Sequence, residues 1–271
     1  MQRLRIAAIS SYSKYCDIEE NLNNFKLLIE KASTKKAKFI CFPELALTCY
    51  TNNKDILDVA KIIPGSISDE LEILAKRHDV YLSIGCPEKE DNKYYISQII
   101  VGPQGYIGKY RKNFITESEQ KCGFSAGKGY PTFMIDSFRL GINIGYDARQ
   151  TETIDIMKNK NCNVIHNPHA NYMLMGNNAE EWTHGKSIYF VPRAVQTRAY
   201  QIVNCCAGDT LEVKEKKSHS SGALIIDPLG QITKRTKQAT RTEKILIGDI
   251  IKPLSSLIPD FEMDWYRIKD R

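Results

Sequence analysis

The chain has 271 residues, of which 42% are hydrophobic and 26% are charged, so it can bury a large core, and this composition excludes a disordered or collagen-like protein. Its 38 basic and 32 acidic residues leave a net charge of +6, but no nucleic-acid-binding motif accompanies the dispersed positive charge. The apolar runs are far shorter than the roughly 18 residues of a membrane helix, and we expect no signal peptide. We therefore expect neither a nucleic-acid nor a membrane partner.

The cysteines favour a reducing compartment. Eight are present, several of them inside apolar runs, and none forms a C-x-x-C pair. This pattern is typical of buried thiols in a cytoplasmic protein rather than of a disulfide framework. The five histidines are not spaced from the cysteines as zinc ligands are, so the sequence predicts no metal site.

Strand and helix patterns alternate along the chain. In the first half we predict a strand at residues 4–9, a helix at 18–35, a strand at 39–42, a helix at 66–78 and strands at 80–86, 94–101 and 106–110. In the second half we predict strands at 132–135 and 138–144, a helix at 152–159, a strand at 163–166, a helix at 182–198 interrupted near Pro192, and strands at 201–206, 222–226, 231–233 and 244–250.

No linker divides the chain, so the pattern predicts one α/β domain. The hairpin turn at residues 102–105 means that the sheets cannot be entirely parallel, and mixed sheets covered by helices are the simplest arrangement. We expect this domain to span residues 1–250. Residues 251–271 are expected to form a tail that packs on the body or on a partner subunit.

Three segments carry residues that could do chemistry. Residues 42–45 read Phe-Pro-Glu-Leu directly after a buried strand, at the strand end where open α/β sheets place ligands. Residues 108–113 carry three cations in a short stretch after another strand. Residues 140–149 run from a buried strand through a glycine into a polar turn, which resembles a turn that lifts one side chain above a sheet. Each segment alone could be an ordinary loop.

Together, in this order, the segments resemble the nitrilase superfamily of carbon–nitrogen hydrolases, in particular its amidase and carbamoylase branches. That family has a Pro-Glu after its second strand, a Lys-Tyr-Arg-Lys stretch and a Gly-x-x-Ile-Cys-Tyr-Asp-x-Arg turn. Further similarities extend over nearly the whole chain and involve Trp182, Arg193, Ala194, Asn204, Gly208 and residues 221–230. The resemblance implies a four-layer αββα sandwich of mixed sheets, and subunits that pair into a homodimer or a higher even oligomer.

The resemblance also implies a Glu–Lys–Cys triad, in which the thiolate attacks an amide, carbamoyl or nitrile carbon, the Glu moves protons and the Lys stabilises the intermediate. Carried over by position, Glu44 is the base and Lys112 is the stabilising cation. Many members have a second Glu, which Glu117 or Glu119 could supply here, and Glu119 is preferred. The family needs no metal or organic cofactor, and no motif here predicts one.

At the nucleophile position this sequence has Gly145 instead of cysteine. Glycine has no side chain to attack a carbon, and only Cys122 and Cys162 are candidates to approach the pocket from elsewhere. Since glycine tolerates strained dihedral angles, the fold can survive this loss. We expect a small void beside Glu44 and Lys112, with room for a water or a small ligand, and we expect these two opposite charges to keep each other ionised.

The residues after the turn differ too, because Gln150 and Thr151 stand where the family has Phe-Pro. These changes predict an inactive pseudoenzyme that binds a small amide, carbamoyl or carboxylate ligand. Two alternatives stay open: an active amidase or carbamoylase whose cysteine was replaced by design, and an enzyme in which Tyr146 or a bound water acts with Glu44. The candidates for ligand contacts are Tyr50, Tyr146, His169, Asn171 and Tyr172.

Overall fold

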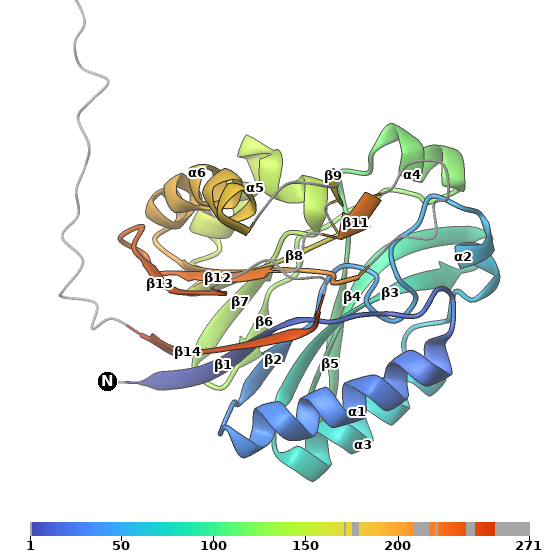
Figure 1. The fold of residues 1–271 in the computed structure, drawn as a ribbon, viewed down its shortest axis with the longest axis horizontal. Coiled ribbons are helices and arrows are strands. Elements are labelled where there is room, and N and C mark those ends of the chain that lie inside the picture. The colour runs from blue at the N-terminus through green and yellow to red at the C-terminus, as the bar shows by residue number, and fades with distance from the viewer. Residues whose placement is uncertain are drawn as a thin grey trace, which may run out of the picture.

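The computed structural model describes residues 2–170, 172–174, 179–208, 217–219, 222–236 and 242–252, and side chains at 172–174, 179–184 and 217–219 are not described. The chain builds two six-stranded sheets, in the orders β14-β1-β2-β3-β4-β5 and β13-β12-β10-β8-β7-β6, and β9 pairs with β11 beside them. The two large sheets face each other, with helices on both outer sides (Figure 1). The predicted αββα sandwich of mixed sheets is confirmed.

The first sheet and its helices come from the first half of the chain and the last strand. Their bounds are β1 (Arg3–Ser10), α1 (Ile18–Thr34), β2 (Phe39–Cys41), α2 (Asp55–Asp58), α3 (Ser66–His78), β3 (Tyr81–Glu90), β4 (Lys93–Gly102), β5 (Gly105–Arg111) and β14 (Lys244–Ile251). Parallel pairing joins β2 to β1 and to β3, whereas β4, β5 and β14 add antiparallel strands. The apolar faces of α1 and α3 cover this sheet.

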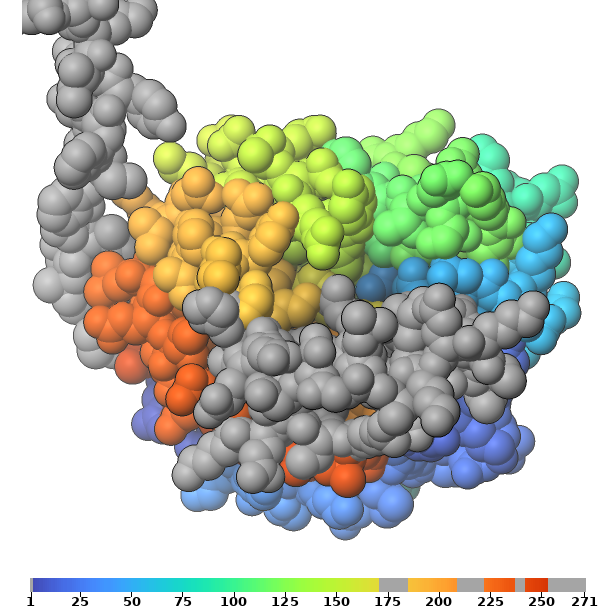
Figure 2. Space-filling model, turned by 45° about the horizontal axis from the view of Figure 1, so that its top comes forward, coloured from blue at the N-terminus to red at the C-terminus, as the bar shows by residue number. Residues whose placement is uncertain are grey.

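The second sheet repeats the plan with the remaining elements. They are α4 (Glu117–Cys122), β6 (Phe133–Ile135), β7 (Phe138–Ile142), a 3₁₀ helix (Gly145–Arg149), α5 (Thr151–Asn159), β8 (Val164–His169), β9 (Tyr172–Leu174), α6 (Ala179–Thr197), β10 (Tyr200–Cys205), β11 (Lys217–His219), β12 (Gly222–Ile226) and β13 (Ile232–Arg235). Helices α5 and α6 lie side by side on its outer face, where Figure 2 shows them at the surface.

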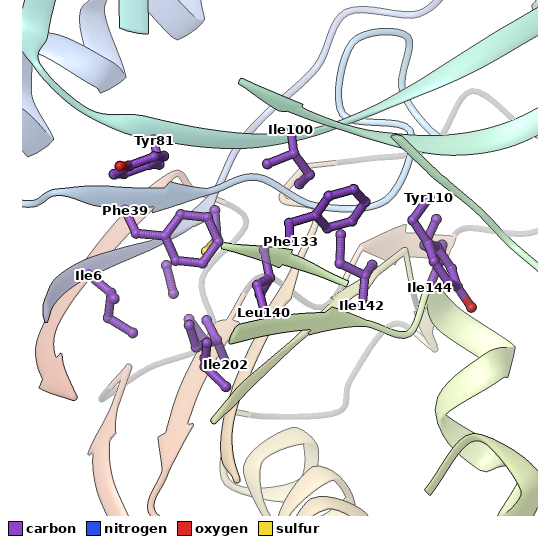
Figure 3. Close-up of a cluster of buried hydrophobic side chains, with 14 of the residues drawn as sticks. Ile6, Phe39, Tyr81, Ile100, Tyr110, Phe133, Leu140, Ile142, Ile144 and Ile202 are labelled. Atoms are coloured by element: carbon purple, nitrogen blue, oxygen red, sulfur yellow. The ribbon is translucent and has the colours of Figure 1, made fainter. Parts of the chain in front are cut away.

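The largest core cluster fills the space between the sheets. Phe39 and Ile100 from the first sheet meet Leu140 and Ile202 from the second, and all four are fully buried (Figure 3). Burial of a side chain of this size stabilises the fold by about 1.5–3 kcal/mol, so the apolar layer holds the two sheets together.

Two predicted elements differ from the structure. The helix expected to break near Pro192 runs continuously through it to Thr197, because neighbouring contacts hold α6 against β12. The strand expected to end at residue 166 continues to His169, which is therefore the last residue of β8 and not part of a loop. The expected tail lies mostly outside the described residues, which end at Lys252. Among the described helices, none is long and apolar enough to span a membrane.

Candidate functional site

A cavity of about 280 Å³ lies where chain segments leaving both sheets meet. Glu44 follows β2, Lys112 follows β5, Gly145 follows β7, and His169 ends β8; all four line the cavity. Strand ends carry side chains to such positions without interrupting the sheet ladders. Segments that lie far apart in the sequence therefore converge on one spot.

The turn that carries Glu44 packs closely against strand β3. Leu45 has φ of +50°, and the turn lies against Gly85 of β3 so closely that an added Cβ there would come within 2.4 Å of the Pro43 carbonyl oxygen. Only glycine permits this approach. Cys206 also donates its thiol proton to the Glu44 carbonyl oxygen, with 3.3 Å between the sulfur and the oxygen. The Glu44 side chain is 3% exposed, so its carboxylate is almost completely buried at the cavity wall.

Lys112 joins two carboxylates. Its Nζ lies 2.7 Å from Glu44 Oε1 and 2.6 Å from Glu119 Oε1, and the ammonium group is 2% exposed. Such short charge-assisted bonds are stronger than neutral ones, and here they are removed from solvent. The three side chains therefore form one buried cluster, which carries an excess negative charge when both carboxylates are ionised.

Helix α4 positions Glu119 through a capping box. Thr116 is the N-cap residue, its hydroxyl accepts a bond from the Glu119 backbone N–H at 3.3 Å, and Glu119 Oε2 accepts one from the Thr116 N–H at 2.8 Å. Tyr50 donates its hydroxyl proton to Glu119 Oε1 at 2.8 Å. Glu117 lies on the exposed side of α4 and pairs with Lys121. Of the two candidate carboxylates, the structure brings Glu119 to Lys112.

Gly145 stands at the centre of this cluster. Its φ is +51°, in the left-handed region that favours glycine. A Cβ at this position would lie 2.7 Å from Glu44 Oε2 and 3.1 Å from Lys112 Nζ. These side-chain ends crowd a Cβ at the turn itself, but Glu44, Lys112 and Gly145 all line the cavity of about 280 Å³, so the expected space beside the two charges is present. Room for a ligand lies in the adjoining cavity.

The protonation of the cluster differs from the sequence-based expectation. Burial raises the pKa of Glu44 from 4.5 to about 7; Lys112 opposes this shift, and the nearby Glu119 adds to it. Burial alone would lower the pKa of Lys112, but the two carboxylates together raise it, so the lysine stays charged. Lys112 thus keeps its charge, whereas Glu44 titrates near neutral pH. A carboxyl group with this pKa can both donate and accept a proton.

Asp147 ties the Gly145 turn to the segment that carries Lys112. Its Oδ2 accepts bonds from the Tyr110 hydroxyl at 2.8 Å and the Ile144 N–H at 3.1 Å, and its Oδ1 accepts one from the Phe114 N–H at 2.7 Å. Burial raises its pKa to about 6, against these hydrogen bonds. In the sequence, the only sign of this positioning role is the place of Asp147 two residues after Gly145.

Basic groups line the other side of the cavity. Lys186 of α6 is half-buried, and burial, with a smaller contribution from Arg149, lowers its pKa to about 8. His169 is buried, and burial together with Lys186, Lys112 and Arg149 lowers its pKa well below 6.5. Its Nε2 has no hydrogen-bond partner among the described residues. The sequence did not single out Lys186 or Arg149 as cavity residues, since a lysine or arginine in a helical pattern is ordinarily a surface residue.

The remaining candidates divide into three groups. Tyr50 lines the cavity through its contact with Glu119, and Tyr146 lines it from the rim, 40% exposed, with the Arg149 guanidinium 5.9 Å from its ring centre. Asn171 and the side chain of Tyr172 lie outside the described residues. All eight cysteines are described, and none lines the cavity. Cys122 and Cys162 therefore do not replace the missing nucleophile.

This arrangement of a buried Glu, Lys and Glu around a turn between two sheets defines the class of the protein. Residues 4–256 match the carbon-nitrogen hydrolase family, so the chain belongs to that family. Among its relatives, human Omega-amidase NIT2 is 27% identical over 267 residues, covering 94% of this chain and 89% of the relative. A nitrilase of Pyrococcus abyssi is 28% identical over 202 residues, covering 73% of this chain and 71% of the relative.

Solved structures show the same fold. Saccharomyces cerevisiae Nit3, a nitrilase-superfamily member, superposes with a TM-score of 0.78 at 21% identity, covering 92% of this chain and 90% of that chain. A double mutant of the amidase from Nesterenkonia sp. AN1, in complex with acrylamide, gives a TM-score of 0.80 at 18% identity, covering 98% and 96% of the two chains. At these identities the likeness establishes the architecture alone.

Proposed function

We propose that this protein binds a small amide, carbamoyl or carboxylate compound without hydrolysing it. The observation that carries the proposal is Gly145, where the family's motif has the nucleophilic cysteine. Covalent hydrolysis needs a nucleophile within reach of the bound carbon, and glycine supplies none. Atoms of Glu44 and Lys112 lie within 3.1 Å of the position that a Cβ at residue 145 would take.

The charges of the cavity indicate how a ligand is oriented. Glu44, which titrates near neutral pH, can exchange hydrogen bonds with an amide or carbamoyl group beside Lys112. On the other side, Lys186 and Arg149 attract a carboxylate, since like charges held close together are stabilised by an intervening anion. We therefore propose that the amide end lies toward Gly145 and that any carboxylate lies toward Lys186.

Titration calorimetry with two matched ligands tests both statements. Butyramide and succinamate have the same four-carbon amide chain, but succinamate carries a carboxylate in place of the terminal methyl group. We expect both to bind, succinamate more tightly, and we expect Lys186→Met to remove most of the difference. Lys158→Met on the exposed face of α5 is the control and should change neither affinity. If neither ligand binds at millimolar concentration, the proposal fails.

One alternative is an active amidase or carbamoylase whose cysteine was replaced by design. The intact contacts of Lys112 with Glu44 and Glu119 favour it, since these groups would serve a restored thiol. A cysteine codon at position 145 of the natural gene would support this alternative. Gly145→Cys tests it in solution: hydrolysis of small amides by that variant alone would show that the rest of the site is competent.

The other alternative places the chemistry on Tyr146 or on a bound water. Tyr146 lines the cavity together with Glu44. If this alternative holds, the unmodified protein hydrolyses an amide, and Glu44→Gln abolishes that activity. Tyr146→Phe then separates the two nucleophiles, because a water-based reaction survives the loss of the phenol.

We further propose a cytoplasmic homodimer or higher even oligomer. All eight cysteines are described, and because none of them forms a disulfide they support a reducing compartment. Along α6 and the turn before β13, Ile188, Val195 and Leu229 are exposed apolar side chains, which favours burial against a second copy. Light scattering after size-exclusion chromatography tests the assembly: Ile188→Glu should shift the mass toward that of one chain, and a wild-type monomer contradicts the proposal.

A further inference from the structure

A chain of hydrogen bonds crosses from one sheet to the other behind the candidate site. It is formed by four fully buried side chains, here called the polar bridge: Gln98 of β4, Ser83 of β3, His166 of β8 and Asn204 of β10. Gln98 Nε2 lies 3.1 Å from Ser83 Oγ, which in turn lies 2.9 Å from His166 Nδ1. The chain continues from His166 Nε2 to Asn204 Oδ1 at 2.8 Å.

The last residue of the bridge fixes the direction of every bond in it. Asn204 Nδ2 donates to the carbonyl oxygens of Ile9 and Cys41, at 2.7 and 2.9 Å, and so uses both of its hydrogens. Asn204 Oδ1 can only accept, so His166 carries its proton on Nε2, and His166 Nδ1 accepts from the Ser83 hydroxyl. Burial, which lowers the pKa of His166 to about 4, keeps the imidazole neutral as this pattern requires.

Both ends of the bridge hold the strand end that leads to Glu44. Gln98 Nε2 donates to the Phe42 carbonyl oxygen at 3.1 Å, and Asn204 Nδ2 holds the preceding carbonyl, that of Cys41. These are the last two carbonyl groups before Pro43 and Glu44. The backbone of His166 reaches the other half of the site, because its carbonyl oxygen accepts a bond from the Asn143 N–H at 3.0 Å, two residues before Gly145.

We propose that the polar bridge is a positioning device, in which His166 sets the end of β2 so that the Glu44 carboxylate meets Lys112 beside the Gly145 turn. The surrounding layer between the sheets is apolar, and isoleucines fill it at Ile100 and Ile202. Apolar side chains could fill the positions of the four bridge residues in the same way, so packing alone does not explain why these four are polar. Their bonds converge on carbonyl groups beside Glu44, which gives them a role in the geometry of the site.

Ser83→Ala tests the proposal against a matched control, Ser97→Ala. Ser97 is equally buried on the neighbouring strand β4, but its hydroxyl bonds Glu88, outside the bridge. The readout is the Glu44 pKa, measured by NMR on protein with carboxyl-labelled glutamate, with Glu44→Gln to assign the signal. Both serine variants leave in place the other charged groups that act on Glu44, namely Lys112, Glu119, Asp147 and Lys186.

We expect Ser83→Ala to lower the Glu44 pKa from about 7 toward 4.5, because a loosened strand end admits water and relieves the burial that raises it. A fall of about half a unit, a threefold change in proton affinity, is expected, with no change in Ser97→Ala. Gln98→Met, which releases the Phe42 carbonyl directly, should act in the same direction.

An unchanged or raised Glu44 pKa in folded Ser83→Ala and Gln98→Met overturns the inference. So does failure of both variants to fold while Ser97→Ala folds, because the bridge would then serve folding and not positioning. The inference assigns the bridge to the site of the proposed function, but the pKa readout needs no ligand. If the Glu44 pKa shifts in these variants but the wild type binds no ligand, the positioning role of the polar bridge is supported and the proposed function is refuted.

Discussion

Replacing Gly145 by alanine should destabilise the fold, and the structure sets the size of the effect. The φ of +51° costs an L-residue about 1–2 kcal/mol. The new Cβ also meets Glu44 Oε2 at 2.7 Å, so the carboxylate must move and weaken its bond to Lys112, at a further cost of about 1–3 kcal/mol. After an offset of about 0.4–1 kcal/mol for the stiffer unfolded chain, a net loss of about 1–5 kcal/mol is expected.

Urea unfolding measures this loss, and Gly185→Ala is its control. Gly185 lies within α6, and an added Cβ there meets no atom of the described part of the chain within 4 Å. Alanine should therefore raise the stability by about 0.5–1 kcal/mol at this position. If Gly145→Ala is as stable as the wild type while Gly185→Ala behaves as expected, the structure is wrong about both the strained backbone at position 145 and its crowding by Glu44.

Three further predictions concern the buried cluster. Between pH 5 and 8 the unfolding free energy of the wild type should fall by about 1–3 kcal/mol relative to that of Glu44→Gln. The reason is that the pKa of Glu44 is raised from 4.5 to about 7 in the folded state, which gives stability below pH 4.5 that is lost as the pH rises through 7. Parallel pH profiles of the two proteins would argue against a raised pKa of Glu44. Lys112→Met should cost about 3–5 kcal/mol at pH 8, since it leaves two buried carboxylates without a cation, and a cost under about 1 kcal/mol in urea unfolding would contradict the buried pairs. Glu119→Gln should weaken amide binding measured by calorimetry, whereas Glu117→Gln on the exposed face should leave it unchanged; equal effects would place the wrong carboxylate in the cavity.

The layers of the fold were predictable because the strands and long helices that build them have clear patterns of apolar residues in the sequence. Buried strands such as β2 and β7 appear as short apolar runs, and the 3.6-residue apolar period marks α1 and α3. The short elements α2 and α4 escaped prediction, since a helix of one or two turns has no measurable period. The end of β8 was misplaced because Asn167 and Pro168 are typical of turns, although pairing with β10 continues through them.

The site was predictable where motif order fixes it and unpredictable where packing does. Glu44, Lys112 and Gly145 follow strand ends, so their convergence could be expected from the resemblance. Lys186 comes from a helix whose sequence gives no sign that it reaches the cavity. The pKa of Glu44 could not be foreseen either, because it depends on the degree of burial and on a second carboxylate, and both are consequences of packing.

The measurement that tests the central claim most directly is ammonia release from succinamate and butyramide by the unmodified protein, followed over hours at saturating ligand. The account predicts that calorimetry detects binding while ammonia stays at the level of the buffer and of Glu44→Gln. Ammonia production that depends on Glu44 would contradict it, because a turn with glycine at position 145 would then support hydrolysis after all.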